Sequence, residues 1–310
     1  MTYLNNSDAY LSCTLCPHNC KANRVTGKLG VCLTDTSFNI ASICAHKGEE
    51  PVISGENGIC NVFFYHCNMQ CVYCQNFQIS KNCTSLNSQY TDKKAIGEIC
   101  QLLDSGCHAL GFVSPSHCIV QMSEIIEKVN IKGFYPVVVY NSNAYDKVET
   151  LKMLEKCVDL YLPDFKYADD NLAYQLSGVK NYTLTALKAI EEMIRQKNEI
   201  LELNDMGLAS KGVIIRHLVL PNFIGNSKKV LQTIADKFGN NIHISLMSQY
   251  FPTPQVMKNN ELNSFIDADA YNEIVDFLCD LGFENGFIQE IDSINNYRPD
   301  FDKTHPFENH

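Results

Sequence analysis

The stretch VFFYHCNMQCVYC, residues 62–74, decides how this chain is interpreted, because an apolar run of strand type leads directly into three closely spaced cysteines. Its aromatic and β-branched residues favour a strand, and Cys67, Cys71 and Cys74 lie on the loop that leaves it. We call these three cysteines the triplet. Three thiolates with this spacing can bind three corners of a four-iron four-sulfur cluster and leave the fourth iron without a protein ligand. A zinc site needs a fourth ligand, such as His66 or Cys60.

Short apolar runs alternate with helical patterns along the rest of the chain. Strands are predicted at 62–66, 109–113, 135–140, 158–162, 212–220 and 242–247, and helices at 93–104, 118–130, 145–156, 184–199, 226–238 and 268–281. This alternation implies parallel strands with right-handed crossovers, which leaves a doubly wound sheet or an open or closed barrel.

A second group of cysteines, Cys13, Cys16, Cys20 and Cys32, precedes the first predicted strand. Four thiolates can close a tetrahedral zinc site or hold a second iron–sulfur cluster, and the spacing leaves both open. Because few long apolar runs accompany them, we expect a small metal-binding module, which we call the leader. The predicted units are the leader over 1–50, a larger domain over 51–290 and an irregular tail over 291–310.

Composition limits the classes of function. The 310 residues include 25 Lys+Arg and 35 Asp+Glu, a formal net charge of −10, and no basic run, which argues against a nucleic-acid binder. No apolar stretch approaches the roughly 20 residues that span a membrane, and the first residues lack a secretion signal. The 15 cysteines are many for a cytosolic protein, and clustered cysteines in a reducing compartment hold metals more often than disulfides. We therefore expect a cytoplasmic metalloprotein.

The residues around the triplet resemble a known family. With Tyr73 before its last cysteine, the triplet resembles the signature of the radical S-adenosylmethionine superfamily, and CVYCQN (71–76) resembles the C-x-Y-C-x-N of pyruvate formate-lyase activating enzymes. YNSNAY (140–145), DFK (164–166) and IRHLVLPN (215–222) follow in the family's order. With its leader, the chain is most similar to a pyruvate formate-lyase activating enzyme-like branch.

This resemblance implies an α/β fold, a partial (β/α)6 barrel with a small cysteine-rich N-terminal module. It implies that the triplet binds a 4Fe-4S cluster that reductively cleaves S-adenosylmethionine to a 5′-deoxyadenosyl radical for hydrogen abstraction. Aligned residues would hold the cofactor: Tyr73 and Asn76 beside the adenine, and Asn141, Asp164, Lys166 and Arg216 at the methionine end or an associated cation. Outside the family context, Asp164 and Lys166 would be interpreted as a salt bridge.

Three positions depart from the family pattern. Residues 113–117, Val-Ser-Pro-Ser-His, replace the usual Gly-Gly-Glu turn, so Ser114 and Ser116 would have to supply the oxygens that bind the cofactor's amino group. Asn141 replaces an acid, and Gln249 replaces a histidine that helps hold the ribose. Each change keeps a polar group but alters its charge, which predicts the same cofactor with a different reaction partner.

Three functions remain open at this point. The leading one is activation of a glycyl radical protein, with an electron donor such as flavodoxin or ferredoxin. The second is radical modification of a small molecule or a peptide. The third is binding without catalysis, by a protein in which zinc ions bound to both cysteine groups have a structural role.

Overall fold

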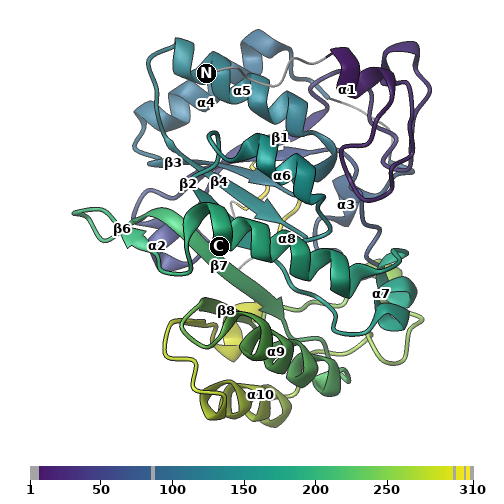
Figure 1. Ribbon diagram of the computed structural model, residues 1–310, viewed down its shortest axis with the longest axis vertical. Helices are drawn as coiled ribbons and strands as arrows, with labels where there is room; N and C mark the ends of the chain where they lie inside the picture. Colours follow the sequence, from purple (N-terminus) through teal and green to yellow (C-terminus); the bar gives the residue numbers. More distant parts are fainter. Residues whose placement is uncertain (1–6, 85–87, 296–297, 304, 308–310) are drawn as a thin grey trace.

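The computed structural model describes residues 7–84, 88–295, 298–303 and 305–307. Its centre is one sheet with the order β1-β2-β3-β4-β5-β7-β8-β9, and β6 pairs with β7 beside this path (Figure 1). Neighbouring strands from β2 to β9 are parallel, whereas β1 and β6 run antiparallel to their partners. The strands are β1 (Ile40–His46), β2 (Ile59–Phe64), β3 (Ala109–Val113), β4 (Val137–Ser142), β5 (Leu160–Pro163), β6 (Glu202–Leu203), β7 (Ala209–Leu218), β8 (His243–Met247) and β9 (Gly286–Ile288).

The strand order decides between the architectures that the sequence left open. From β2 to β8, the strands of the main path follow one another in the sheet as they do in the chain. A doubly wound sheet reverses its order at a switch point, so that alternative is wrong. Right-handed crossovers between successive neighbours place the connecting helices on one face. In the described residues no pairing joins β1 to β9, so the sheet is open.

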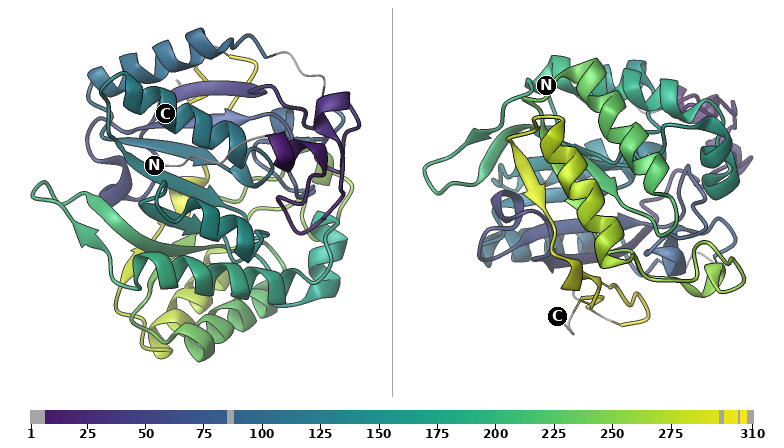
Figure 2. Two further views of the ribbon diagram at one scale, coloured as in Figure 1. Left: turned by 45° about the horizontal axis from the view of Figure 1, so that its top comes forward. Right: turned by 90° about the horizontal axis from the view of Figure 1, so that it is seen from below.

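The longer helices cover the sheet in chain order, from α4 and α5 beside the first strands to α9 and α10 beside the last (Figures 1 and 2). They agree with five of the predicted ranges within two residues at either end. The sixth, predicted over 145–156, is shorter because Ala144 has a positive φ and Asp146 is tied to β4. The helices are α4 (Asp92–Asp104), α5 (Ile119–Ile131), α6 (Val148–Leu154), α7 (Asp170–Ser177), α8 (Tyr182–Lys197), α9 (Ile224–Phe238) and α10 (Ala268–Asp280), with the short helices α1 (Ser7–Leu11), α2 (Pro51–Ser54) and α3 (Phe77–Ser80).

Strand side chains alternate between the helix-covered face and the opposite face. On β7, Ile215 belongs to the large apolar core beneath the helices, whereas Ile214 packs in a smaller cluster with Val139 and Leu162. Arg216, two residues after Ile214, therefore points to the opposite face, where the short helix α2 contributes Ile53 to the smaller cluster. The sequence predicts that Arg216 points inward, and the alternation of side chains along β7 places it on that face.

β1 is an element that the sequence analysis missed. Residues 40–46 fall within the predicted leader, yet they pair with β2 along its length. The boundary at residue 50 remains a prediction, but the part of 1–50 that includes β1 belongs to the main sheet. β9, with three residues, is too short to show a periodic pattern.

The predicted tail begins with a short 3-10 helix (Ile291–Asn295), and described residues beyond it pack on the β1–β2 edge. Phe301 meets Phe63 edge-on and Phe307 meets it at a tilt, with ring centroids 5.2 and 5.9 Å from it, and Gln78 donates to Asp300 and Asp302. The remaining tail positions, 296–297, 304 and 308–310, lie outside the described residues.

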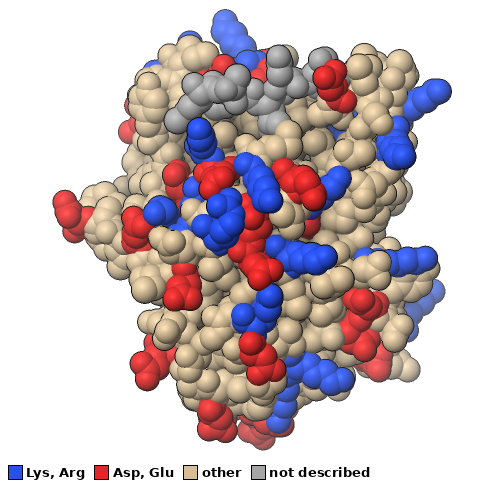
Figure 3. Space-filling model, viewed as in Figure 1, with Lys and Arg blue, Asp and Glu red and all other residues tan. Residues whose placement is uncertain are grey.

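On the face that Figure 3 shows, lysine and arginine side chains are interspersed with aspartate and glutamate, and no single sign of charge dominates. Among the described helices, none has the length and apolar character needed to cross a bilayer.

Candidate functional site

The triplet lies on the loop between β2 and α3, at the C-terminal end of its strand as predicted. The side chain of Cys67 is buried, and those of Cys71 and Cys74 are half-buried. Backbone hydrogen bonds from Gln70 to Ser177 (3.2 Å) and from Val72 to Leu176 (2.8 Å) attach the loop to the end of α7. The three sulfur atoms are therefore held by a packed loop.

Each sulfur of the triplet has a polar hydrogen directed at it. The Met69 amide donates to Cys67 Sγ at 3.4 Å, the Ser177 hydroxyl to Cys71 Sγ at 3.0 Å and the Ser80 hydroxyl to Cys74 Sγ at 3.2 Å. Donors to sulfur stabilise a thiolate more than a neutral thiol. These groups therefore suit three cysteine thiolates, which are the form that binds a metal.

Burial opposes that ionisation while no metal is bound. It raises the pKa of Cys67 to about 12, and although the Met69 amide lowers this value, the neighbouring charges of Cys71 and Cys74 raise it further. Burial also raises the pKa of Cys71, whereas the ammonium of Lys166 lowers it. Because a metal deprotonates the thiols that coordinate it, the donors and Lys166 favour the metal-bound form. The residues present thus fit an iron–sulfur cluster at the triplet.

Lys166 connects the triplet to the DFK motif. Its ammonium pairs with Asp164 Oδ2 at 2.6 Å, and both side chains are largely buried. Burial works against its charge, but Asp164, Cys71 and Cys74 together raise the pKa of Lys166. The predicted salt bridge is therefore formed, and its cation lies in the field of the cysteine sulfurs. A contact with the methionine end of a cofactor remains a prediction.

Arg216 faces inward, but its guanidinium is already bound. It donates to Glu49 at 2.6 Å and to Glu50 at 2.8 Å through Nε, with a further contact between Nη2 and Glu50. Burial tends to raise the pKa of Glu49, yet Arg216 and His46 hold it at about 2. Sequence reasoning missed both acids, although two adjacent glutamates between a strand and Pro51 were visible. A cofactor bound by Arg216, as predicted, would share its guanidinium with Glu49 and Glu50.

The second and third strand ends form one polar network. Ser114 adopts a left-handed conformation, and its amide donates to the Asn141 carbonyl at 2.7 Å. The Tyr140 hydroxyl lies 3.5 Å from Ser116 and donates to Asp146 at 2.9 Å. Ser116 is therefore engaged with its neighbours, and Asp146, which sequence reasoning missed, is the acid of this network. Burial raises the pKa of Asp146, while the hydroxyls around it lower it.

Tyr73 begins a chain of hydroxyl groups that ends at the triplet. Its hydroxyl lies 2.6 Å from that of Tyr167, which lies 2.6 Å from Ser177, which donates to Cys71. Asn76 is the residue before α3. Gln249 lies farther along the sheet, where it accepts from Gln289 at 3.0 Å. Their predicted roles at the adenine and ribose remain predictions.

The sulfurs of the four leader cysteines lie within electrostatic reach of one another, and their role as metal ligands remains a prediction. Burial raises the pKa of Cys16 to about 12; the His18 amide opposes this, and the nearby sulfurs of Cys32, Cys13 and Cys20 add to it. The chain passes so close to Cys20 at Gly30 that a Cβ there would lie 2.3 Å from the sulfur. Close sulfurs around a glycine turn are suited to a shared metal.

Arg24 adds a buried charge to this cluster. Only 2% of it is exposed; its guanidinium donates to the His117 carbonyl at 2.8 Å and to Cys32 Sγ at 3.6 Å. In the described part of the chain no carboxylate pairs with it. Buried charges need an opposite charge, and the sulfurs of Cys32, Cys13 and Cys118 are near enough to affect this guanidinium. The residues present thus fit thiolates in the leader.

The leader also contacts the triplet loop. His18 Nε2 lies 2.7 Å from the Asn68 carbonyl, and the Asn68 side chain accepts from Asn143 at 2.8 Å. Asn82 donates to the Val31 carbonyl at 2.6 Å and accepts from the Cys67 amide at 3.2 Å. Sequence reasoning missed these asparagines, since nothing local marks a contact across such separations. They hold the two cysteine groups in one body.

Within the ranges that the structure describes, no three or more cysteine, histidine or carboxylate side chains are gathered as the ligands of a single metal ion. The fit of both cysteine groups therefore rests on the hydrogen-bond donors to their sulfurs and on the charged side chains beside them.

No protein-family model matches the chain. It is 28% identical to the uncharacterized protein MJ0674 of Methanocaldococcus jannaschii over 294 residues, which cover 86% of this chain and 72% of that protein. The name of this relative states no function.

Among solved structures, SuiB of Streptococcus suis with precursor peptide SuiA aligns over 74% of this chain and 48% of its own, at 13% identity and a TM-score of 0.46. HydG, a maturase of the FeFe-hydrogenase, aligns over 76% of this chain and 53% of its own, at 16% identity and a TM-score of 0.49. Native anSMEcpe with bound AdoMet aligns over 72% of this chain and 60% of its own, at 15% identity and a TM-score of 0.48. The chain spans about half the length of the first of these structures, and the proposals below rest on its own residues.

Proposed function

We propose that this protein is a radical S-adenosylmethionine enzyme whose triplet holds a 4Fe-4S cluster. The observation that carries the proposal is the setting of Cys67, Cys71 and Cys74. They lie on a loop at the C-terminal end of a parallel strand, each with a hydrogen-bond donor to its sulfur, and a buried lysine lies beside them. When bound, the cluster supplies the electron that cleaves S-adenosylmethionine to methionine and a 5′-deoxyadenosyl radical, which abstracts hydrogen from a substrate.

The chain's own residues would bind and orient the cofactors. Ser80 and Ser177 stabilise the thiolates through their hydroxyls, and Lys166 offsets the negative charge of the site. The sheet face that carries Arg216 offers polar groups to a nucleotide. The packed loop and the buried tyrosine chain exclude water from the reacting groups.

The finer features of the proposal rest on the family resemblance. They are a partial (β/α)6 barrel, a glycyl radical protein as substrate, and flavodoxin or ferredoxin as electron donor. A cytoplasmic location belongs to the same proposal, because clustered cysteines hold metals in a reducing compartment. Modification of a small molecule or a peptide is the second candidate, since the same site would serve it.

We also propose that the leader holds a metal, either zinc or a second iron–sulfur cluster. Arg24 supports this assignment, because a buried guanidinium beside Cys32 and Cys13 needs thiolates rather than thiols as partners. Four thiolates leave no open position for a substrate at a zinc ion. A structural role or electron transfer is therefore the function we assign to the leader.

The test is anaerobic reconstitution followed by reduction in the presence of S-adenosylmethionine. We expect about four irons at the triplet and release of 5′-deoxyadenosine. The Cys71→Ala variant should lose cleavage, whereas Cys279→Ala, at an exposed cysteine outside both groups, should retain it. Zinc alone in the protein, with no cleavage product, would support the zinc-stapled binding protein instead.

A further inference from the structure

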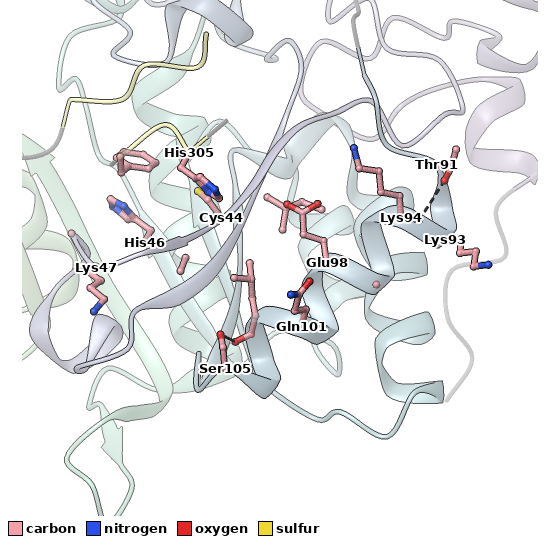
Figure 4. Close-up of a pocket in the computed structure, with 16 residues that line it drawn as sticks. Cys44, His46, Lys47, Thr91, Lys93, Lys94, Glu98, Gln101, Ser105 and His305 are labelled. Carbon is pink, nitrogen blue, oxygen red and sulfur yellow. Dashed lines mark hydrogen bonds between the residues drawn. The ribbon is translucent and has the colours of Figure 1, made fainter. Parts of the chain in front are cut away.

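A large groove lies between β1 and α4, and of the candidate site it shares His46, a neighbour of Glu49. Its volume is about 1190 Å³. Residues 43–48 line one side and α4 lines the other, and His305 of the tail lies on the β1 side (Figure 4). Phe307 lines the groove as well. A groove with a strand edge along its length is suited to an extended chain.

The β1 side of the groove is the free edge of the sheet. β1 pairs only with β2 in the described residues, so its other edge has no strand neighbour. The Ile43 amide donates to the Tyr90 hydroxyl at 3.3 Å, which directs that peptide group away from β2. Because peptide groups alternate along an antiparallel strand, the amide of Ala45, two residues on and exposed, points the same way. This edge can form further main-chain hydrogen bonds.

The α4 side presents one helical stripe, which includes Lys94, Gly97, Glu98, Gln101 and Ser105. Gly97 is in the middle of α4, where glycine costs about 1 kcal/mol relative to alanine. A Cβ at Gly97 would meet no atom within 4 Å, so packing does not require glycine there. A glycine that faces a groove without a packing reason leaves room for close approach of another backbone.

The charge of the groove is opposite to that of the protein. Its lining carries Lys47, Lys93 and Lys94 against Glu98, although the chain has a net charge of −10. Within the described ranges none of these lysines pairs with a carboxylate. Apolar side chains such as Leu102 also line it. Acidic side chains that alternate with apolar ones fit this lining.

We propose that the groove binds an extended acidic segment of a partner polypeptide, which adds as a strand to the free edge of β1. Main-chain hydrogen bonds to the Ala45 edge would supply affinity, and the lysines would select acidic sequences. The proposal is independent of the metal sites, so it stands or fails separately from the proposed function.

The first experiment measures fluorescence anisotropy of a labelled peptide of alternating glutamate and valine with the full chain. We expect it to bind about tenfold more tightly than the matched lysine–valine peptide. Methylation of alternate peptide nitrogens removes the donors of a strand and should weaken binding by a further factor of about ten. Equal affinity for the methylated peptide would overturn strand addition, and no binding of the acidic peptide would overturn the proposal.

Variants locate the binding to the groove. Gly97→Leu should retain the fold, since its Cβ enters open space and helix propensity improves, but it should block the peptide; Gly97→Ala should be tolerated better. Lys94→Glu should weaken acidic binding, whereas Lys188→Glu, an exposed lysine on α8, should not. Equal binding by all four variants would place the peptide elsewhere. A concentration-dependent dimer that Gly97→Leu abolishes would identify a second copy as the occupant and contradict the proposal.

Discussion

Replacing Glu49 by glutamine tests whether the buried ion cluster at Arg216 is formed. The pKa of Glu49 is held at about 2 instead of 4.5, because Arg216 and His46 outweigh the burial that tends to raise it. Since the folded pKa is the lower one, the stabilisation is complete above pH 4.5 and is lost as the pH falls through 2. The shift corresponds to about 3 kcal/mol at neutral pH. We expect Glu49→Gln to lower the free energy of unfolding by up to that amount.

The assay is urea unfolding of the wild type and the variant in the same metal state, at pH values between 7 and 4. The difference between them should narrow by about 0.8 kcal/mol over this range, as the unfolded carboxyl becomes protonated. The control is Glu202→Gln, which breaks an exposed pair with Lys211 and should cost less than about 1 kcal/mol. Equal losses for the two variants, with no dependence on pH, would refute a buried cluster and leave Arg216 available to a cofactor.

Three further predictions concern other contacts. Ser177→Ala removes the donor to Cys71 Sγ, so we expect a lower reduction potential of the triplet cluster in an electron paramagnetic resonance titration; an unchanged potential would contradict a hydrogen bond to the sulfur. Arg24→Met should reduce metal retention by the leader in elemental analysis while the triplet keeps its iron, and equal loss from both sites would contradict a local counter-charge. Gly111→Ala should destabilise the fold by about 1–3 kcal/mol in urea, because its Cβ would lie 2.0 Å from the Asn61 side chain, whereas Gly97→Ala should stabilise it; the opposite order would contradict the packing.

The regular elements could be predicted because their signals are local. The strand over 109–113 matches β3 at both ends, and the helix over 93–104 differs from α4 by one residue. Alternation and helical spacing mark such elements within a short window. β1 lacked this advantage, since its IASICAH sequence mixes polar and apolar residues and it lies among cysteines that suggested a separate module.

The cysteines of the site could be predicted from the sequence, whereas many residues that contact the site could not. The triplet spacing is local, so Cys67, Cys71 and Cys74 were visible at once. The bond from Arg216 to Glu49 spans 167 positions, and that from Arg24 to His117 spans 93. No short-range pattern encodes these contacts, because the topology of the sheet creates them. Glu49, Glu50 and the asparagines of the triplet loop, which sequence reasoning missed, lie where two distant segments meet.

The most direct test of the proposed function is electron–nuclear double resonance of the reduced, reconstituted protein with S-adenosylmethionine that carries an isotope label in its amino group. We predict a coupling between the cluster spin and the labelled nitrogen, since one iron of the triplet cluster is left to the nucleotide. Cys71→Ala should lose both the cluster signal and the coupling. A cluster that forms normally but shows no coupling would contradict an iron open to the cofactor.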